Sequence, residues 1–179
     1  MSLPPASAPG PDVATSLLAR GARFVHTTPR QRAEALEDTA FGLHLSGSEA
    51  EGLGEHLRTY RLEPGTTLFA EGDRDAFLAL VVAGTLEIRK ADSAEHDHVV
   101  ARLGRGKLVG EMSLIDGAPR SATARALTQA ELLVLSRADF ERLCEQRPRL
   151  ALLLLRQVST AIAQLLRQTT GRMVEHLEH

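Results

Sequence analysis

The sequence contains one cysteine, no tryptophan and few other aromatic residues. Cys144 alone cannot form an intramolecular disulfide or supply a cysteine-based zinc finger. A single cysteine also fits a reducing compartment. Because aromatic residues are 3% of the chain and hydrophobic residues 43%, we expect an aliphatic core. The 179 residues are enough for one domain.

An excess of charge of one sign and a long hydrophobic run are also missing. The 21 Lys and Arg against 23 Asp and Glu give a net charge of −2, without the basic excess typical of proteins that bind nucleic-acid backbone. The longest aliphatic run, Leu150–Leu155, is far shorter than the roughly 20 residues that cross a bilayer. The N-terminus lacks a signal-peptide pattern. We therefore expect a cytoplasmic protein that does not enter a membrane.

Changes of composition along the chain predict its organisation. The first 11 residues are rich in proline, serine and alanine and cannot bury an apolar face, so they are expected to be disordered. The predicted segments are a partly disordered leader (1–29), an N-terminal helical segment (30–58), a β core (59–136), C-terminal helices (137–176) and a possible tag remnant (177–179).

Short apolar or alternating runs separated by glycine-containing turns predict a β sandwich or barrel. The Phe77–Val82 run is apolar throughout and is expected to be a central strand. The predicted strands are Thr66–Ala70, Phe77–Val82, Thr85–Lys90, His98–Leu103, Ser121–Ala126 and Glu131–Leu135.

Several residues predict where helices begin. Pro29 suits the first position of a helix, and Ser48 is a candidate N-cap for a helix through Leu57. Ser136, with Asp139 three residues later, predicts a capping box.

The last predicted helix begins at Pro148 and runs to Thr170, before Gly171 ends it. Four apolar residues in it follow the spacing of a coiled-coil seam. These residues are Leu155, Val158, Ile162 and Leu165. A homodimer through the 149–170 helix is therefore expected.

The segment Gly110–Ala124, which reads GEMSLIDGAPRSATA, carries the most chemistry; we call it the cassette. A one-turn helix at its start would point free backbone amides at an anion. Arg120 adds a planar donor fork suited to phosphate oxygens. Glu111 beside such a site is explained if its carboxylate accepts hydrogen bonds from a hydroxyl such as a ribose 2′-OH. Together these residues predict a nucleotide with its phosphate against the cassette.

The cassette resembles the phosphate-binding cassette of the cyclic nucleotide-binding domain family, as found in protein kinase A regulatory subunits and catabolite activator-type regulators. The family pattern is G-E-x-[AS]-L followed by P-R-[AST]-A, and the resemblance extends over roughly residues 40–168. The matching residues are Gly110, Glu111, Ser113, Leu114, Pro119, Arg120, Ser121 and Ala122.

The resemblance implies a mainly β fold, a small eight-stranded jelly-roll barrel with N-terminal helices and a long C-terminal helix. It implies a non-enzymatic sensor that binds a cyclic nucleotide, cAMP or alternatively cGMP, and relays occupancy through the helices after the barrel. The implied ligand-binding residues are Gly110, Glu111, Met112, Ser113, Arg120, Ser121 and Ala122, with Val100, Val109 and Leu165 lining the base. Activator-type regulators continue into a helix-turn-helix domain; no DNA-binding element is expected in this chain.

Two alternatives remain. One is a degenerate sensor of the same fold that takes cGMP, another anion or nothing. The other is a small cupin-type metalloenzyme, suggested by His96-Asp97-His98. That reading lacks a glutamate shortly after His98 and a further histidine before His176, so neither a metal site nor a cofactor is expected.

Overall fold

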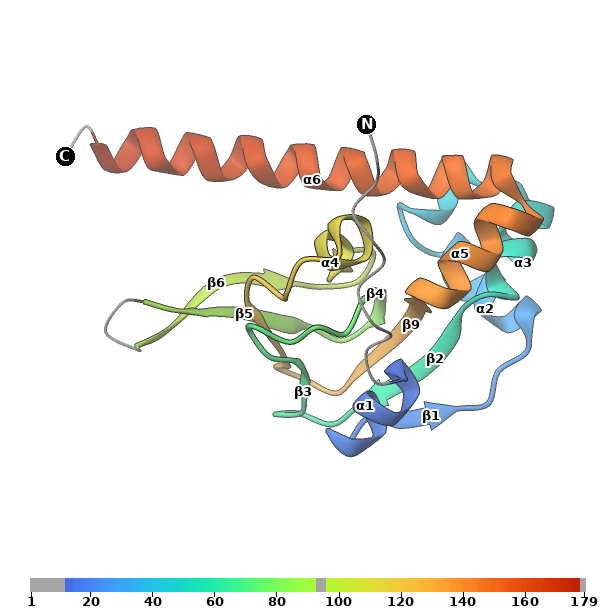
Figure 1. Ribbon diagram of the computed structural model, residues 1–179, viewed down its shortest axis with the longest axis horizontal. Helices are drawn as coiled ribbons and strands as arrows, with labels where there is room; N and C mark the ends of the chain where they lie inside the picture. The colour runs from blue at the N-terminus through green and yellow to red at the C-terminus, as the bar shows by residue number, and fades with distance from the viewer. Residues whose placement is uncertain (1–11, 93–95, 178–179) are drawn as a thin grey trace.

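The computed structural model describes residues 12–92 and 96–177, and two antiparallel β-sheets form its centre (Figure 1). One sheet has the strand order β1-β2-β9-β4-β7 and the other β3-β8-β5-β6. The sheets pack as a jelly roll, as predicted, but within the described residues they stay two sheets rather than one closed barrel. The strands are β1 (Arg23–Val25), β2 (Arg58–Leu62), β3 (Thr67–Phe69), β4 (Phe77–Ala83), β5 (Leu86–Ala91), β6 (Asp97–Leu103), β7 (Leu108–Val109), β8 (Thr123–Ala126) and β9 (Ala130–Ser136).

Strand β4 separates two hydrophobic cores. Phe77, Ala79 and Val81 belong to the first core, which lies between the sheets. Leu78 and Leu80 belong to the second, on the outer face of the five-stranded sheet. Because successive side chains of a strand point to opposite faces, a strand between two cores must be apolar at every position. The predicted central strand is thus confirmed, with β9 on one side and β7 on the other.

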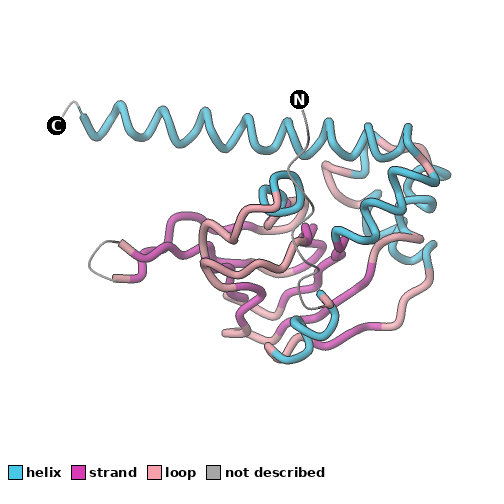
Figure 2. The backbone as a smooth tube through the Cα atoms, in the orientation of Figure 1, coloured by secondary structure: helices cyan, strands magenta, loops and turns pink. Residues whose placement is uncertain are grey.

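Helices cover the second core (Figure 1). They are α2 (Pro29–Glu37), the 3₁₀ turn η1 (Gly42–His44), α3 (Gly47–Gly54), α5 (Arg137–Gln146) and α6 (Pro148–Leu177). In contrast, α1 (Val13–Ala19) lies next to β1 and buries Leu17 in the first core. Figure 2 shows these helices gathered around the strands, with α6 extending past them. Residues 1–11, predicted to be disordered, and residues 178–179 of the predicted tag remnant lie outside the described residues.

The predicted helix starts at Pro29, Ser136 and Pro148 are confirmed, and the one at Ser48 is wrong. Pro29 is the first residue of α2, and the Ser136 hydroxyl caps α5 by accepting a bond from the Asp139 amide at 3.1 Å. The N-cap of α3 is Ser46, not Ser48, and the helix stops at Gly54 before Leu57. Both serines have a glutamate three residues later, so the local pattern could not choose between them.

The predicted end of the last helix is also wrong, since α6 continues through Gly171 to Leu177. Glycine inside a helix costs only about 1 kcal/mol relative to alanine, and it ends a helix only where the backbone turns left-handed.

The apolar face of α6 is divided between the domain and solvent. Its first half buries residues in the second core, and Val158 and Ile162 of the predicted seam pack there too. The exposed apolar side chains include Leu152, Leu165 and Leu166. The predicted seam is therefore only partly available to a second chain.

By length and composition alone, Pro148–Arg167 could cross a membrane, with a mean hydropathy of 1.3. This stretch is not an uninterrupted aliphatic run, because Arg156 and Gln157 break it. One such helix is weak support for a membrane span, since a helix packed on a core passes the same test; here Leu150, Leu154 and Val158 are buried in the second core.

Candidate functional site

The cassette begins where β7 ends, at Gly110, which precedes the short helix α4 (Glu111–Asp116). Gly110 has φ of +79°, a left-handed conformation that favours glycine. A Cβ atom there would lie 2.3 Å from Nη1 of Arg120 and 2.8 Å from the carbonyl oxygen of Phe77. Only glycine fits this position. The predicted one-turn helix is confirmed.

Arg120 reaches back to the start of the same cassette. Its side chain is only 3% exposed and lies between two aromatic rings, with its guanidinium carbon 4.1 Å from the Phe69 centroid and 4.3 Å from that of Phe77. Nη1 donates to the carbonyl oxygen of Gly110 at 2.7 Å. This bond and the two rings fix the guanidinium inside the first core.

Two donors of this buried guanidinium have no partner. Nε and Nη2 of Arg120 donate to no acceptor among the described residues. Burial lowers the pKa of Arg120 to about 10, and the charges of Asp75, Asp73 and Glu111 oppose that shift. Arg120 is thus a cation at neutral pH. Since Nε and Nη2 share one edge of the guanidinium, they can together donate to two oxygens of a phosphate.

Glu111, nine residues before Arg120, is buried at the first position of α4, with 8% of its surface exposed. It forms no ion pair within the described chain. Burial raises the pKa of its carboxyl group, and its own backbone amide and the charge of Arg120 partly offset that rise. A buried carboxylate without a cationic partner can accept hydrogen bonds from neutral hydroxyl groups.

The other predicted ligand-binding residues lie on α4 or in the loop before β8. Ser113 is buried and Met112 is exposed on α4. Ser121 is exposed, and its carbonyl oxygen accepts a bond from Nζ of Lys90 at 2.7 Å. Ala122 follows and is half-buried. The predicted strand over Ser121–Ala126 thus starts later, at Thr123.

The three residues predicted to line a base lie in different surroundings. Val109 is buried in the first core, on β7. Val100 on β6 and Leu165 on α6 are both about half exposed. Their grouping around a base stays a prediction.

The residues that surround Arg120 from outside the cassette were not predicted from the sequence. Phe69 and Phe77 are two of only five phenylalanines, and their scarcity was the available clue. Asp73 and Asp75 lie between Phe69 and Phe77 in the chain, in a segment that we call the acidic turn. Their carboxylates contact α1 and the residue that follows it. Arg20 forms an ion pair with Asp73 at 2.6 Å, and Ser16 donates to Asp75.

Two main-chain hydrogen bonds join the acidic turn around Asp73 to Arg120. The Arg120 amide donates to the Asp73 carbonyl oxygen at 2.8 Å, and the Gly72 amide donates to the Arg120 carbonyl oxygen at 2.8 Å. The backbone of Arg120 is therefore fixed independently of its side chain.

The histidines that suggested a cupin-type metal site lie on the exposed β5–β6 hairpin. His98 Nε2 is 2.9 Å and His96 Nδ1 is 3.4 Å from a carboxylate oxygen of Asp92. Over residues 12–92 and 96–177, no group of three or more His, Cys, Asp or Glu side chains could hold a metal ion.

Comparison with known proteins agrees with this geometry. Over 110 residues the chain is 38% identical to the cyclic AMP receptor protein of Thermus thermophilus, covering 59% of this chain and 51% of the relative. It is 33% identical over 99 residues to a cAMP-dependent protein kinase regulatory subunit of Yarrowia lipolytica, covering 55% of this chain and 26% of that protein. The chain thus spans about half of the length of the first relative and about a quarter of the second.

A solved cyclic nucleotide-binding domain from Methylobacillus flagellatus has the same fold, with a TM-score of 0.77 at 24% identity, covering 87% of this chain and 89% of that one. A jelly roll that buries an arginine with two unpartnered donors beside a short helix is suited to hold an anionic ligand. Residues 59–147 match the model of the cyclic nucleotide-binding domain family. The chain belongs to this family, as the resemblance of the cassette predicted.

Proposed function

We propose that the chain binds cAMP at the cassette, with the cyclic phosphate on Arg120 and the ribose 2′-OH on Glu111. The remaining amide and hydroxyl contacts would come from Gly110, Met112, Ser113, Ser121 and Ala122. The observation that carries this proposal is the pair of buried, unpartnered donors of Arg120. An anionic phosphate would accept from both and remove the cost of about 1–3 kcal/mol that each unmade bond imposes.

The choice of cAMP over cGMP rests on the relatives, because two of them are named for cAMP. The base would lie against Val100, Val109 and Leu165, which are apolar and do not distinguish purines by hydrogen bonds. An exposed hydroxyl at Ser121 is compatible with either base.

We further propose that α6 relays occupancy. Leu114 of α4 belongs to the second core together with Leu154 and Val158 of α6. Figure 1 shows α4 directly beneath α6. A shift of α4 on binding phosphate would therefore alter the packing of α6. The proposed role is regulatory rather than enzymatic, and the proposed location is the cytoplasm.

Homodimerisation through α6 is part of the same proposal. The exposed side chains of Leu152 and Leu166, at 67% and 65%, leave an apolar surface on a helix that runs beyond the domain. A second copy of α6 would cover that surface, as in a coiled coil.

Calorimetric titration with cAMP, cGMP and 2′-deoxy-cAMP tests the binding proposal. We expect one site per chain, micromolar or tighter affinity for cAMP, and weaker binding of the 2′-deoxy ligand. Tighter binding of cGMP would change the ligand but keep the site. Absence of heat with all three would contradict the proposal.

A further inference from the structure

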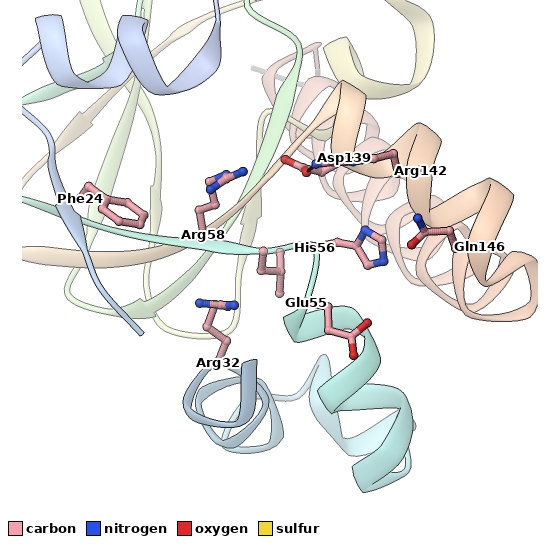
Figure 3. A pocket seen from close by; sticks show the side chains of 9 residues that line it. Phe24, Arg32, Glu55, His56, Arg58, Asp139, Arg142 and Gln146 are labelled. Atoms are coloured by element: carbon pink, nitrogen blue, oxygen red, sulfur yellow. Dashed lines mark hydrogen bonds and ion pairs between the residues drawn. The ribbon is translucent and has the colours of Figure 1, made fainter. Parts of the chain in front are cut away.

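A second polar cavity lies away from the cassette. It has a volume of about 320 Å³ and lies between α2, the segment from α3 into β2, and α5 (Figure 3). The basic groups of the cavity come from Arg32, His56, Arg58 and Arg142. Its carboxylates come from Glu55 and Asp139. Neither Arg120 nor Glu111 lines it.

Both carboxylates of this cavity are already occupied. Asp139 forms an ion pair with Arg142 and accepts a bond from the Ser136 hydroxyl at 2.5 Å. Glu55 pairs with Arg147 at 3.0 Å. Neither carboxylate forms an ion pair with the remaining two arginines of the cavity.

Arg32 and Arg58 are the uncompensated cations, since neither forms an ion pair with any described carboxylate. Nε of Arg32 donates to the Gly54 carbonyl oxygen at 2.7 Å, and Nη1 is bonded to Thr27, which leaves Nη2 without such a bond. Burial and the charge of Arg58 lower the pKa of Arg32. Two like charges on one cavity favour an anion between them.

His56 supplies a third group. It is 7% exposed, and its Nε2 atom is buried without a hydrogen-bond partner in the described chain. Figure 3 shows the ring between the end of α3 and α5. A buried polar atom without a partner is rare in native proteins, so a hydrogen-bond acceptor or donor beside Nε2 would remove a cost. The imidazole can donate from Nε2 in one neutral tautomer or when protonated.

We propose that this cavity is a second anion site, which binds a phosphate group through Arg58, Nη2 of Arg32 and Nε2 of His56. The chemical class is an inorganic phosphate or a small phosphomonoester. The bound group would connect α2 and β2 with α5, which leads directly into α6. The site is independent of nucleotide binding at Arg120.

Titration of the full chain with inorganic phosphate, in phosphate-free buffer and without nucleotide, tests the inference. We expect saturable binding that R58A weakens at least tenfold. R30A is the matched control, because Arg30 is a strongly exposed cation on α2 whose partner is Glu34 rather than a cavity residue. R30A and R120M should bind phosphate in the cavity like the wild type. Glycerol 3-phosphate in a parallel titration distinguishes the two sources: tighter binding than phosphate indicates a phosphomonoester, and equal binding indicates the free ion.

Amide NMR shifts of the wild type give a second measurement that needs no variant. Phosphate should move the resonances of His56 and Arg142 in a saturable manner. The inference is overturned if millimolar phosphate moves neither resonance, or if R120M abolishes binding while R58A leaves it unchanged. The latter result would assign the phosphate to the cassette and support the proposed function. Failure of cAMP to bind would leave the cavity result unaffected.

Discussion

Arg120 donates to the carbonyl oxygen of Gly110 at 2.7 Å, so the glycine and the arginine of the cassette pattern meet although nine residues lie between them. The bond uses one nitrogen of the guanidinium and leaves the edge formed by Nε and Nη2 for a ligand. It also requires the close approach of backbone and side chain that glycine permits at position 110.

Replacing Gly110 by alanine should therefore damage both stability and binding. The left-handed backbone costs about 1–2 kcal/mol for a residue with a Cβ atom, and the clash with the Phe77 carbonyl oxygen adds to it. We expect G110A to lower the free energy of unfolding by about 2 kcal/mol or more in urea denaturation. G21A is the control, because Gly21 has a similar φ but nothing within 4 Å of its Cβ position. Equal losses of unfolding free energy in G110A and G21A would show that the close approach of Gly110 to Arg120 and Phe77 has no cost.

Arg120 should dominate the affinity for cAMP. R120M keeps an apolar stem between Phe69 and Phe77 and removes the charge that would pair with phosphate. We expect a loss of about 3 kcal/mol, roughly a hundredfold in the dissociation constant measured by calorimetry. R105M, which removes a surface cation paired with Asp38, should bind like the wild type. Affinity of R120M within a few-fold of the wild type would remove Arg120 from the site.

Glu111 should favour binding at the expense of stability. Its pKa in the folded chain is above the ordinary 4.5, so the folded state holds the proton more tightly than the unfolded state. The contribution of this group to stability is thus greatest below pH 4.5 and decreases as the pH rises through the raised pKa. We expect E111Q to be more stable than the wild type at pH 7, with the difference vanishing near pH 4.

Urea denaturation at both pH values measures that difference, with E51Q, a change at an exposed position of α3, as the control. In calorimetry, E111Q should bind cAMP about tenfold more weakly and distinguish it less from the 2′-deoxy ligand. Unchanged discrimination would argue against contact between Glu111 and the 2′-OH.

Leu114 should couple the cassette to α6. It is almost fully buried in the second core, so L114A should cost about 3 kcal/mol of stability. Amide hydrogen exchange of α6 measures the coupling: cAMP should change the exchange rates in the wild type and change them less in L114A. I115A removes an exposed side chain of the same helix and should respond like the wild type. An unaltered α6 in the ligand-bound wild type would exclude this relay.

The dimer should depend on the solvent-facing side of α6. L166E places a charge where an apolar side chain is 65% exposed, and sedimentation should then report a monomer. Q164E adds the same charge two residues away and should remain dimeric if its side chain lies outside the interface. A dimer that persists in L166E, or a monomeric wild type, would contradict an interface through this part of α6.

Much of the fold could be predicted because its elements have strong local patterns. Each of the six predicted strands overlaps a strand of the structure, and the uninterrupted apolar Phe77–Val82 run marked the centre of the sheet. The strands β1, β2 and β7 were missed. At two to five residues they are too short for a periodic pattern, and pairing with neighbours stabilises them.

The sequence by itself determined the cassette, because its glycine, its one-turn helix and its arginine are local features with a fixed spacing. Only the tertiary structure decided what surrounds that arginine. Phe69, Phe77 and the acidic turn between them form one segment that is far from Arg120 in the chain, and α1, which holds the turn, comes from a third segment. The helical periodicity of α6 likewise marked apolar positions but not their partners. Packing on the second core, a matter of long-range contacts, decided that Val158 faces its own domain while Leu152 faces solvent.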